Sequence, residues 1–350
     1  MARTQRATIQ DVAVLSGLSI CTVSRALRNL PNVSDHAHRL VADAAEKLGY
    51  KASSAASRLA GGTTGAVAII APTATAWFFA QAVEAAEEVF ADSGLDTILV
   101  SLRNKPSVHR KVFSDLTALT QRVDGVLLIN VDLDETEIQA LSASDLRVAS
   151  VGMHDVPWDN VGIDNEDAAW QATSHLLGLG HWNLAVLAAR EKRGYSVATS
   201  QQRLAGFTRA LEEQHLTVHP DLVIDADSSI EGGRRAMTEL IAHRSLPTAI
   251  FAHCDEAAFG ALMALREHGL SSPKDVSLIG IDDHPMSWFM GLSTVAQPVA
   301  DQGAFAANLL VERLQNPEAS HEPTHHLLNT KLIERKTTRR KRGTEKHKHD

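Results

Sequence analysis

The sequence predicts a small all-α helix-turn-helix domain followed by a larger α/β two-lobed domain with parallel sheets. Residues 1–50 contain three short amphipathic segments separated by turn residues. Residues 65–333 alternate helix-length segments with apolar runs that predict buried strands, among them 66–71, 125–129, 249–252 and 276–281. The segment between these patterns, 51–64, is small, polar and weakly helical, as a linker is. A chain of 350 residues is long enough for about two to three domains.

Three short helices are expected in the first domain. Thr8 provides an N-cap for the first helix, and Gly17 ends it. Ser19 caps the second helix only a few residues later, and Ser34 caps a third that Gly49 ends. Apolar residues recur at helical spacing in all three: Ile9, Val12, Ala13 and Leu15, then Val23, Ala26 and Leu27, then Leu40, Val41, Ala44, Ala45 and Leu48. A helical bundle with no nucleic-acid role is the alternative interpretation.

The net charge of −8 is unevenly distributed along the chain. Residues 1–60 carry a local charge of +4, residues 335–350 carry +6, and the part between them carries −18. Only the two ends can therefore attract a polyanion such as DNA through counterion release. We expect the acidic body to stand clear of DNA.

Composition and motifs argue against several other classes of protein. The chain has no run of about 18 apolar residues and no secretory signal, so we expect a cytoplasmic, nucleoid-associated protein. Cys21 and Cys254 have no CxxC partner, and the histidines near the C-terminus lack ligand spacing, so we expect no metal. The sequence contains no GxSxG, HExxH or GxxxxGK[ST] motif, so we expect neither an enzyme nor a cofactor.

Three strings of the first domain closely resemble the LacI/GalR family of repressors: Thr8-Ile9-Gln10-Asp11-Val12-Ala13, Thr22-Val23-Ser24-Arg25 and Pro31-Asn32-Val33-Ser34. The resemblance implies that the second helix lies in the major groove, where Ile20, Cys21 and Arg25 read base edges. An arginine fork suits guanine, whereas Ile20 and Cys21 offer apolar contact to a thymine methyl. The full set of DNA-binding candidates is Thr8, Ser19, Ile20, Cys21, Thr22, Ser24, Arg25, Asn32, Tyr50, Lys51, Ser57 and Leu59.

The resemblance also implies a role for the linker. In the family such a segment folds into a hinge helix on operator DNA and wedges one leucine into the minor groove, and Leu59 stands at that place. An apolar wedge unstacks a base step and kinks the duplex. From the residues alone, 51–64 is a flexible linker in which a leucine is unremarkable.

The body resembles the same family in several strings, among them Gly162-Ile163-Asp164-Asn165, Arg203-Leu204-Ala205-Gly206-Phe207 and Gly280-Ile281-Asp282-Asp283. These imply a periplasmic-binding-protein-like domain at 65–333 that binds an effector and dimerises. Its N-lobe would comprise about 65–165 and 299–325, and its C-lobe about 166–298. Residues 334–350 are expected to form a basic disordered tail, which adds phosphate affinity or merely solubilises the chain.

The effector site follows from this resemblance, since relatives hold the effector at the positions of Arg203 and Asp282. A guanidinium and a carboxylate can clamp adjacent hydroxyls, and Phe78 and Phe79 can wall a ring face, with a helix–sheet contact as their alternative role. Cys254 replaces an amide found in relatives, which implies an effector that is less hydroxylated or differently placed. The complete candidate set is Phe78, Phe79, Met153, Arg203, Cys254, Asp255 and Asp282.

These expectations describe a sequence-specific repressor that binds a pseudo-palindromic operator as a homodimer or tetramer. A sugar or polyol is the expected effector. The alternatives are a repressor of the same architecture that responds to a purine or nucleoside, and a cytosolic sugar-binding protein or enzyme built on the same body.

Overall fold

The computed structural model describes residues 7–27, 33–50, 63–153, 155–189, 197–242, 246–319 and 322–341. The chain divides into two compact units, Met1–Ala66 with Gln121–Asp124, and Val67–Thr120 with Gly125–Asp350. Among the described helices, none combines the length and the apolar composition that a membrane span needs.

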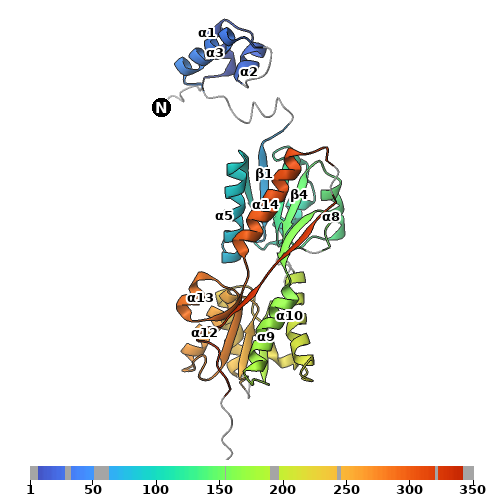
Figure 1. The fold of residues 1–350 in the computed structure, drawn as a ribbon, viewed down its shortest axis with the longest axis vertical. Coiled ribbons are helices and arrows are strands. Elements are labelled where there is room, and N and C mark those ends of the chain that lie inside the picture. Colours follow the sequence, from blue (N-terminus) through green and yellow to red (C-terminus); the bar gives the residue numbers. More distant parts are fainter. Residues whose placement is uncertain are drawn as a thin grey trace, which may run out of the picture. The chain divides into compact units, whose positions relative to one another are not determined.

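The first unit contains the three predicted helices, α1 (Ile9–Ser16), α2 (Ile20–Leu27) and α3 (Asp35–Leu48) (Figure 1). Thr8 and Asp11 form a capping box at α1, while Gly17 and Gly49 end α1 and α3 in the left-handed region with φ of 69° and 59°. The core consists of Val12, Ala13, Val23, Ala26, Val41 and Ala44. Leu15, expected in this core, is instead 50% exposed, because only one stripe of an eight-residue helix can face inward.

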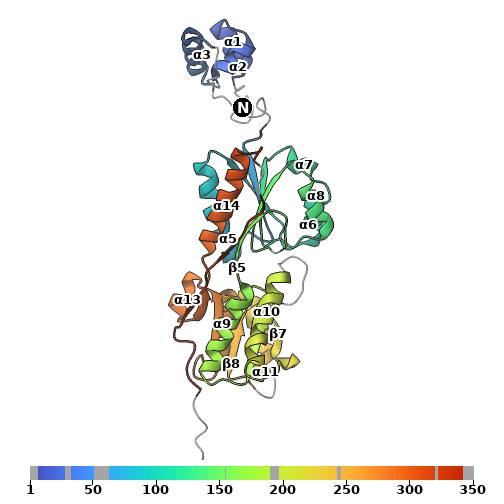
Figure 2. The ribbon, with the colours of Figure 1, turned by 45° about the vertical axis from the view of Figure 1, so that its right-hand side comes forward.

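The N-lobe of the second unit is a six-stranded sheet in the order β11-β5-β4-β3-β1-β2. Its strands are β1 (Ala66–Ala71), β2 (Asp96–Ser101), β3 (Gly125–Ile129), β4 (Arg147–Val151), β5 (Asp159–Ile163) and β11 (His325–Leu328). One face is covered by α5 (Trp77–Asp92) and α14 (Val299–Gln315), which lie side by side, and the other by α6 (Pro106–Phe113), α7 (Thr117–Thr120) and α8 (Glu135–Ser142) (Figure 2). A Cβ at Gly303 would lie 2.3 Å from the Ala82 carbonyl oxygen, so glycine allows α14 to pack directly on α5.

The C-lobe is a second six-stranded sheet in the order β12-β10-β9-β8-β6-β7. Its strands are β6 (Leu184–Ala188), β7 (Val223–Asp225), β8 (Ala249–Ala252), β9 (Ser277–Asp282), β10 (Ser293–Ala296) and β12 (Lys331–Ile333). Helices pack on the sheet through two hydrophobic core clusters. One cluster lies between the sheet and helices α9 (Asn165–Gly178) and α10 (Val197–Glu212), and the other lies between the sheet and helices α11 (Ile230–Ala242) and α12 (Asp255–Glu267). The short helices η1 (Pro220–Leu222) and α13 (Pro285–Met290) follow α10 and β9 along the chain.

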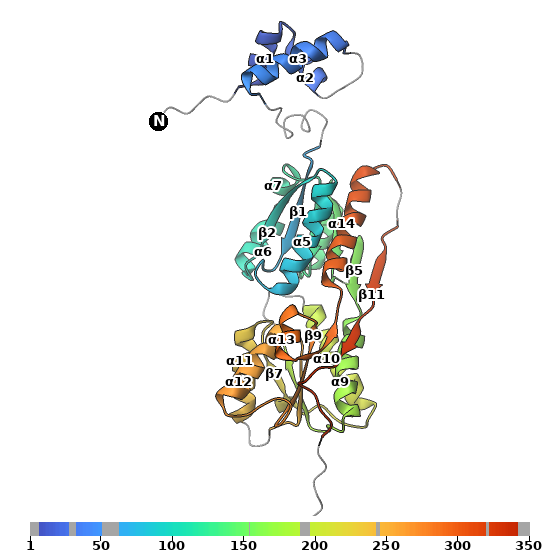
Figure 3. The same cartoon turned by 60° about the vertical axis from the view of Figure 1, so that its left-hand side comes forward.

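The chain passes between the lobes three times (Figure 3). It crosses from β5 into α9, then from β10 into α14, and finally from β11 into β12. In the third crossing, β11 pairs parallel with β5 of the N-lobe and β12 pairs antiparallel with β10 of the C-lobe. The first crossing falls between residues 163 and 165, and the second between residues 296 and 299. The third extends the N-lobe to Leu328 and returns the chain to the C-lobe.

The predicted disordered tail is wrong for the part of 334–350 that the structure describes, which reaches Lys341. Thr337 is 3% exposed, its hydroxyl donates to the Leu278 carbonyl at 2.7 Å, and it accepts from the Ser293 amide at 2.8 Å. Arg335 forms an ion pair of 2.6 Å with Asp283. The basic composition suggested disorder, but these partners lie far away in the sequence, so local composition did not reveal them.

The Thr337 hydroxyl can be removed without a large change of shape by Thr337→Val. Since two buried partners then lose their hydrogen bonds, we expect the free energy of unfolding to fall by about 1–3 kcal/mol in urea titrations. The exposed Arg340→Ala variant is the control and should change it by less than about 0.5 kcal/mol. Equal stability of Thr337→Val and the wild type would contradict the anchoring of this segment.

Candidate DNA interface and effector pocket

The start of α2 carries exposed apolar side chains and is preceded by an N-cap residue. Ile20 is 47% exposed and Cys21 is exposed. The Ser19 hydroxyl accepts from the Thr22 amide at 3.1 Å and lies 2.9 Å from the Thr22 hydroxyl, so both residues fix the start of this helix. Ser24 and Arg25 are half-buried on the same helix.

The remaining DNA-binding candidates divide into two groups. Thr8 caps α1, and Tyr50 packs against the core of the first unit while its amide donates to the Ala45 carbonyl at 2.8 Å. Tyr50 therefore has a structural role of its own. Four candidates lie outside the described residues: Asn32, Lys51, Ser57 and Leu59.

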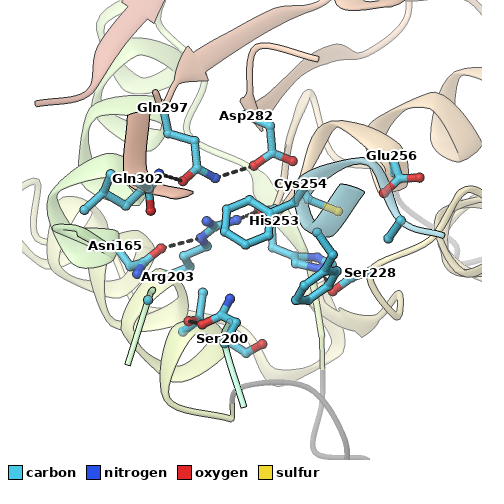
Figure 4. A pocket seen from close by; sticks show the side chains of 17 residues that line it. Asn165, Ser200, Arg203, Ser228, His253, Cys254, Glu256, Asp282, Gln297 and Gln302 are labelled. Carbon is cyan, nitrogen blue, oxygen red and sulfur yellow. Dashed lines mark hydrogen bonds between the residues drawn. The ribbon is translucent and has the colours of Figure 1, made fainter. Parts of the chain in front are cut away.

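A pocket lies at the boundary between the two lobes of the second unit (Figure 4). It contains five of the predicted effector residues: Phe78, Phe79, Arg203, Cys254 and Asp282. The other lining residues are mostly neutral and polar: Ala76, Asn130, Gly152, Ile163, Asn165, Thr199, Ser200, Ser228, His253, Glu256, Gln297 and Gln302. Many of them follow the carboxyl ends of parallel strands, which is where α/β sheets bind ligands.

Arg203 is held in place by acceptors of the protein itself. It is 7% exposed, its Nε donates to Asn165 Oδ1 at 2.9 Å, and its Nη1 donates to the His253 carbonyl. Asp282 is equally buried. Burial raises the pKa of Asp282, while the charge of Arg203 and a hydrogen bond from Gln297 act in the opposite direction.

A chain of amide side chains connects Asp282 to the N-lobe. Gln302, on α14, donates through Nε2 to Gln297 Oε1 at 3.0 Å, and Gln297 donates through Nε2 to Asp282 Oδ1 at 2.6 Å (Figure 4). Asp282 ends β9 with φ of 134°, an unusual conformation for a residue with a side chain. The carboxylate that faces the ligand space is thus bonded to both lobes through Gln297 and Gln302.

His253 and Ser228 form a second polar pair in the wall. The Nδ1 of His253 lies 2.9 Å from the Leu187 carbonyl, which can only accept, so Nδ1 carries the proton. Nε2 then accepts from the Ser228 hydroxyl at 2.9 Å. Burial lowers the pKa of His253 to about 4, so the ring stays neutral at neutral pH.

Glu256 is the second carboxylate that lines the pocket. Burial and the nearby charge of Asp282 raise its pKa to about 7, although a hydrogen bond with the backbone of Trp77 favours the ionised form. Cys254, the residue before Asp255, has a pKa raised by burial, so its thiol remains protonated. Both residues lie at the start of α12.

Two of the predicted effector residues do not line the pocket. The Asp255 carboxylate is fully buried and accepts from the Ser287 hydroxyl at 2.6 Å, the Thr294 hydroxyl at 2.7 Å and the His284 amide at 2.9 Å. It fastens the start of α13 to β10, which is a structural role. Met153 is buried, and its amide donates to Asn160 Oδ1 at 3.1 Å.

Several pocket residues were not predicted from the sequence, and Glu256, Ser228, His253 and Gln297 contribute its chemistry. For His253 and Glu256 a signal was present, because they flank the predicted pair Cys254 and Asp255 directly after β8. Asp255 and Glu256 are adjacent acids, and the sequence does not tell which one faces inward.

Comparison with known proteins identifies relatives over nearly the whole chain. Residues 8–53 match the family described as bacterial regulatory proteins of the lacI family, and residues 173–338 match the periplasmic binding protein-like domain. A repressor named PurR from Actinobacillus pleuropneumoniae serotype 3 (strain JL03) is 32% identical over 338 residues, which covers 95% of this chain and 98% of the relative.

Two solved structures have similar folds over nearly the same range. The lac repressor dimer bound to operator and the anti-inducer ONPF matches with a TM-score of 0.82 and 25% identity, covering 96% of this chain and 100% of that one. A complex of the transcriptional regulator CelR with cellobiose matches with a TM-score of 0.70 and 27% identity, covering 95% and 100%.

The raised pKa of Glu256 predicts how stability depends on pH. The folded state keeps a proton on Glu256 up to about pH 7, whereas the unfolded chain loses it near the ordinary value of 4.5, so this group makes stability fall as the pH rises between the two. Glu256→Gln removes this contribution. We therefore expect the melting temperature of Glu256→Gln, relative to the wild type, to be higher at about pH 8 than at about pH 5.

Glu212→Gln, which removes an exposed carboxylate at the end of α10, is the control and should give a constant difference. The interpretation would be contradicted by a Glu256→Gln difference that does not change over this pH range.

Proposed function

Because the chain belongs to the LacI family of bacterial regulatory proteins, we propose that it represses transcription as a homodimer on a pseudo-palindromic operator, under control of a small sugar or polyol. The observation that carries this proposal is the pocket between the lobes, in which buried Arg203 and Asp282 stand among hydroxyl and amide side chains. The chemistry of this wall suits binding rather than turnover, and the relatives are repressors. The protein would act on DNA in the cytoplasm.

Recognition of the operator is assigned to α2. Ile20 and Cys21 at its exposed start contact base edges through apolar groups, and Arg25 one turn further on pairs with a guanine. Thr8, Ser19, Thr22 and Ser24 contact phosphates, which fixes the register of the helix on the duplex. Leu59 acts as the minor-groove wedge, with Asn32, Lys51 and Ser57 as further backbone contacts.

The effector is proposed to be a sugar or polyol because neutral hydrogen-bonding groups dominate the pocket. Thr199, Ser200 and Ser228 supply hydroxyls, and Asn130 and Gln302 supply amides. Hydroxyl groups of a ligand can donate to and accept from such groups. The related regulator CelR is described in complex with cellobiose.

A purine or nucleoside is the second candidate, because several relatives at 31–32% identity are repressors named PurR. The paired rings of Phe78 and Phe79, with centroids 5.3 Å apart, would then pack against the base.

Control of DNA binding requires that the effector bind two states of the protein unequally. A ligand in this pocket touches Phe79 and Gln302 of the N-lobe as well as Arg203 and Asp282 of the C-lobe. The bonds from Gln302 through Gln297 to Asp282 couple the ligand to the relative placement of the lobes. We propose that the dimer transmits this difference to the hinge segments.

Self-association is assigned in part to α13. Trp288 and Phe289 are 71% and 72% exposed, and Met286 and Met290 on the same helix are also exposed. Apolar side chains gathered on a protein surface commonly mark an interface. The lac repressor, which resembles this chain over its length, is described as a dimer.

The proposed function is tested by two assays on the same purified protein. Fluorescence anisotropy with promoter fragments should reveal a duplex that binds at least about 1,000-fold more tightly than random DNA. A thermal-shift screen of sugars, polyols, purines and nucleosides should then find a stabilising ligand that alters this affinity. Binding to all duplexes with equal affinity would refute the repressor, and product formation from a sugar would favour an enzyme.

For Arg25→Ala we expect a loss of about 1–3 kcal/mol of operator affinity and relaxed selectivity at one base pair, because a bidentate contact to guanine disappears. Competition assays with single-base operator variants measure this selectivity. Lys51→Ala serves as the comparison, since a phosphate contact should weaken all sequences alike and lower the salt dependence. Unchanged selectivity of Arg25→Ala would remove this residue from base recognition.

The double variant Trp288→Ser and Phe289→Ser should shift the protein from dimer to monomer, because α13 loses the two exposed rings that would be buried at the interface. Sedimentation at micromolar concentration measures the change. The exposed Trp182→Ser variant, on the segment after α9, is the control and should remain dimeric. A double variant that dimerises as tightly as the wild type would place the interface elsewhere.

A further inference from the structure

The effector pocket contains more acidic than basic side chains. Asp282 and Glu256 line it, and Arg203 is the one basic side chain, histidine aside, among its described lining residues. A third carboxylate, Asp255, is completely buried behind them, and its electrostatic repulsion from Asp282 adds to the effect of burial in raising its pKa. Carboxylates removed from water are costly unless a cation or several donors face them.

Arg203 does not balance this charge by direct pairing. Its Nε and Nη1 are directed at Asn165 and at the His253 carbonyl, which are neutral acceptors. Within the described part of the chain, no lysine or arginine nitrogen lies within 4.0 Å of a carboxylate oxygen of Asp282 or Glu256. The hydrogen bonds to Asp282 come from the amide of Gln297 and from the backbone of Asp255, which are also neutral.

The aromatic side chains that line the pocket are compatible with a positively charged ligand. Phe78 and Phe79 come from α5 and lie edge to face, with ring centroids 5.3 Å apart. The face of an aromatic ring attracts an ammonium group, particularly where water is excluded. Thr199, Ser200 and Ser228 line another part of the pocket and can bind hydroxyl groups.

From these contacts we propose that the effector is a small hydroxylated amine of the amino-sugar class, whose ammonium group binds at Glu256 and Asp282. This inference rests on the proposed function, since it assigns the chemistry of the same effector pocket. The hydroxyl groups of the ligand bind the serine and threonine side chains, and its apolar face lies against Phe78 and Phe79.

The electrostatics of the pocket agree with this assignment. Glu256 has a pKa of about 7 because it is partly buried beside Asp282, so a proton partly neutralises the pocket near neutral pH. An ammonium group supplies the same neutralisation without protonating the carboxylate, and it adds charge-assisted hydrogen bonds. With a neutral sugar, the same neutralisation still requires the proton on Glu256.

The test uses the full-length protein and matched pairs of ligands in a thermal-shift assay: glucosamine with glucose, galactosamine with galactose, and mannosamine with mannose. The N-acetyl derivatives, which keep the shape near the nitrogen but lose the charge, are added as further controls. At least one amine should raise the melting temperature, while its neutral partner and its N-acetyl derivative at the same concentration do not.

Calorimetry then compares variants with the amine that binds. Glu256→Gln should weaken its binding by at least about 10-fold, because an amide cannot pair with an ammonium charge. Glu212→Gln, which removes an exposed carboxylate far along α10, should bind it as the wild type does.

Three results would overturn the inference: stabilisation by a neutral sugar or purine equal to that by the amine, unchanged affinity in Glu256→Gln, or no stabilisation by any of the amino sugars. Operator binding is measured in parallel by anisotropy. Selective operator binding together with one of these results would refute the amine alone, whereas loss of selective DNA binding would refute the proposed repressor.

Discussion

The second unit depends on holding charged side chains out of water at the boundary between its two lobes. Arg203 and Asp282 are each 7% exposed, and burial of an isolated charge costs several kcal/mol unless hydrogen bonds compensate for it. Asn165, the His253 carbonyl and Gln297 supply these bonds. The contributing residues come from five separate segments, so the pocket exists only when the C-lobe sheet is complete and joined to the crossing strands.

Because the pocket residues are hydrogen-bonded across the lobe boundary, a bound ligand can alter the bonds between the lobes. A ligand that forms hydrogen bonds with Asp282 and Arg203 either replaces or supplements the protein's own hydrogen bonds. Those bonds connect Asp282 through Gln297 to Gln302 on the N-lobe helix α14. We propose that a change in those bonds favours one placement of the lobes over another. A family that regulates DNA binding by small molecules needs such an unequal response, because a ligand with equal affinity for both states shifts nothing.

The sequence predicted the parts of the fold whose signal is local. Continuous apolar runs identified β1, β3, β8 and most of β9, and the serine, threonine and glycine caps identified α1 to α3 close to their observed ends. The strands β5, β7, β10, β11 and β12 went unpredicted, because they are short and carry polar residues such as Asp159, Ser293 and His325. They are strands because neighbours from distant parts of the chain pair with them.

The residues of the effector pocket were also predicted only in part. Arg203, Asp282 and Cys254 were found through a resemblance between strings of residues, whereas Phe78 and Phe79 were proposed from their place at the start of a helix. Phe79 also belongs to the N-lobe core, against which Phe78 packs, so the alternative helix–sheet contact is present as well. That resemblance gave no way to distinguish Asp255, which fastens α13, from Glu256, which faces the pocket, since the orientation of two adjacent helix residues depends on the packing of α12. The anchoring of Thr337 was invisible for the same reason, because its partners are more than forty residues away.

We propose that the pocket and the DNA-binding helices are energetically coupled, and thermodynamic linkage makes this coupling directly measurable. The dissociation constant of a stabilising ligand should be determined by calorimetry for the free protein and for the protein saturated with operator duplex. The account predicts that the two values differ by the same factor, about 5- to 150-fold, by which the ligand changes operator affinity. Equal ligand affinity with and without operator would contradict it.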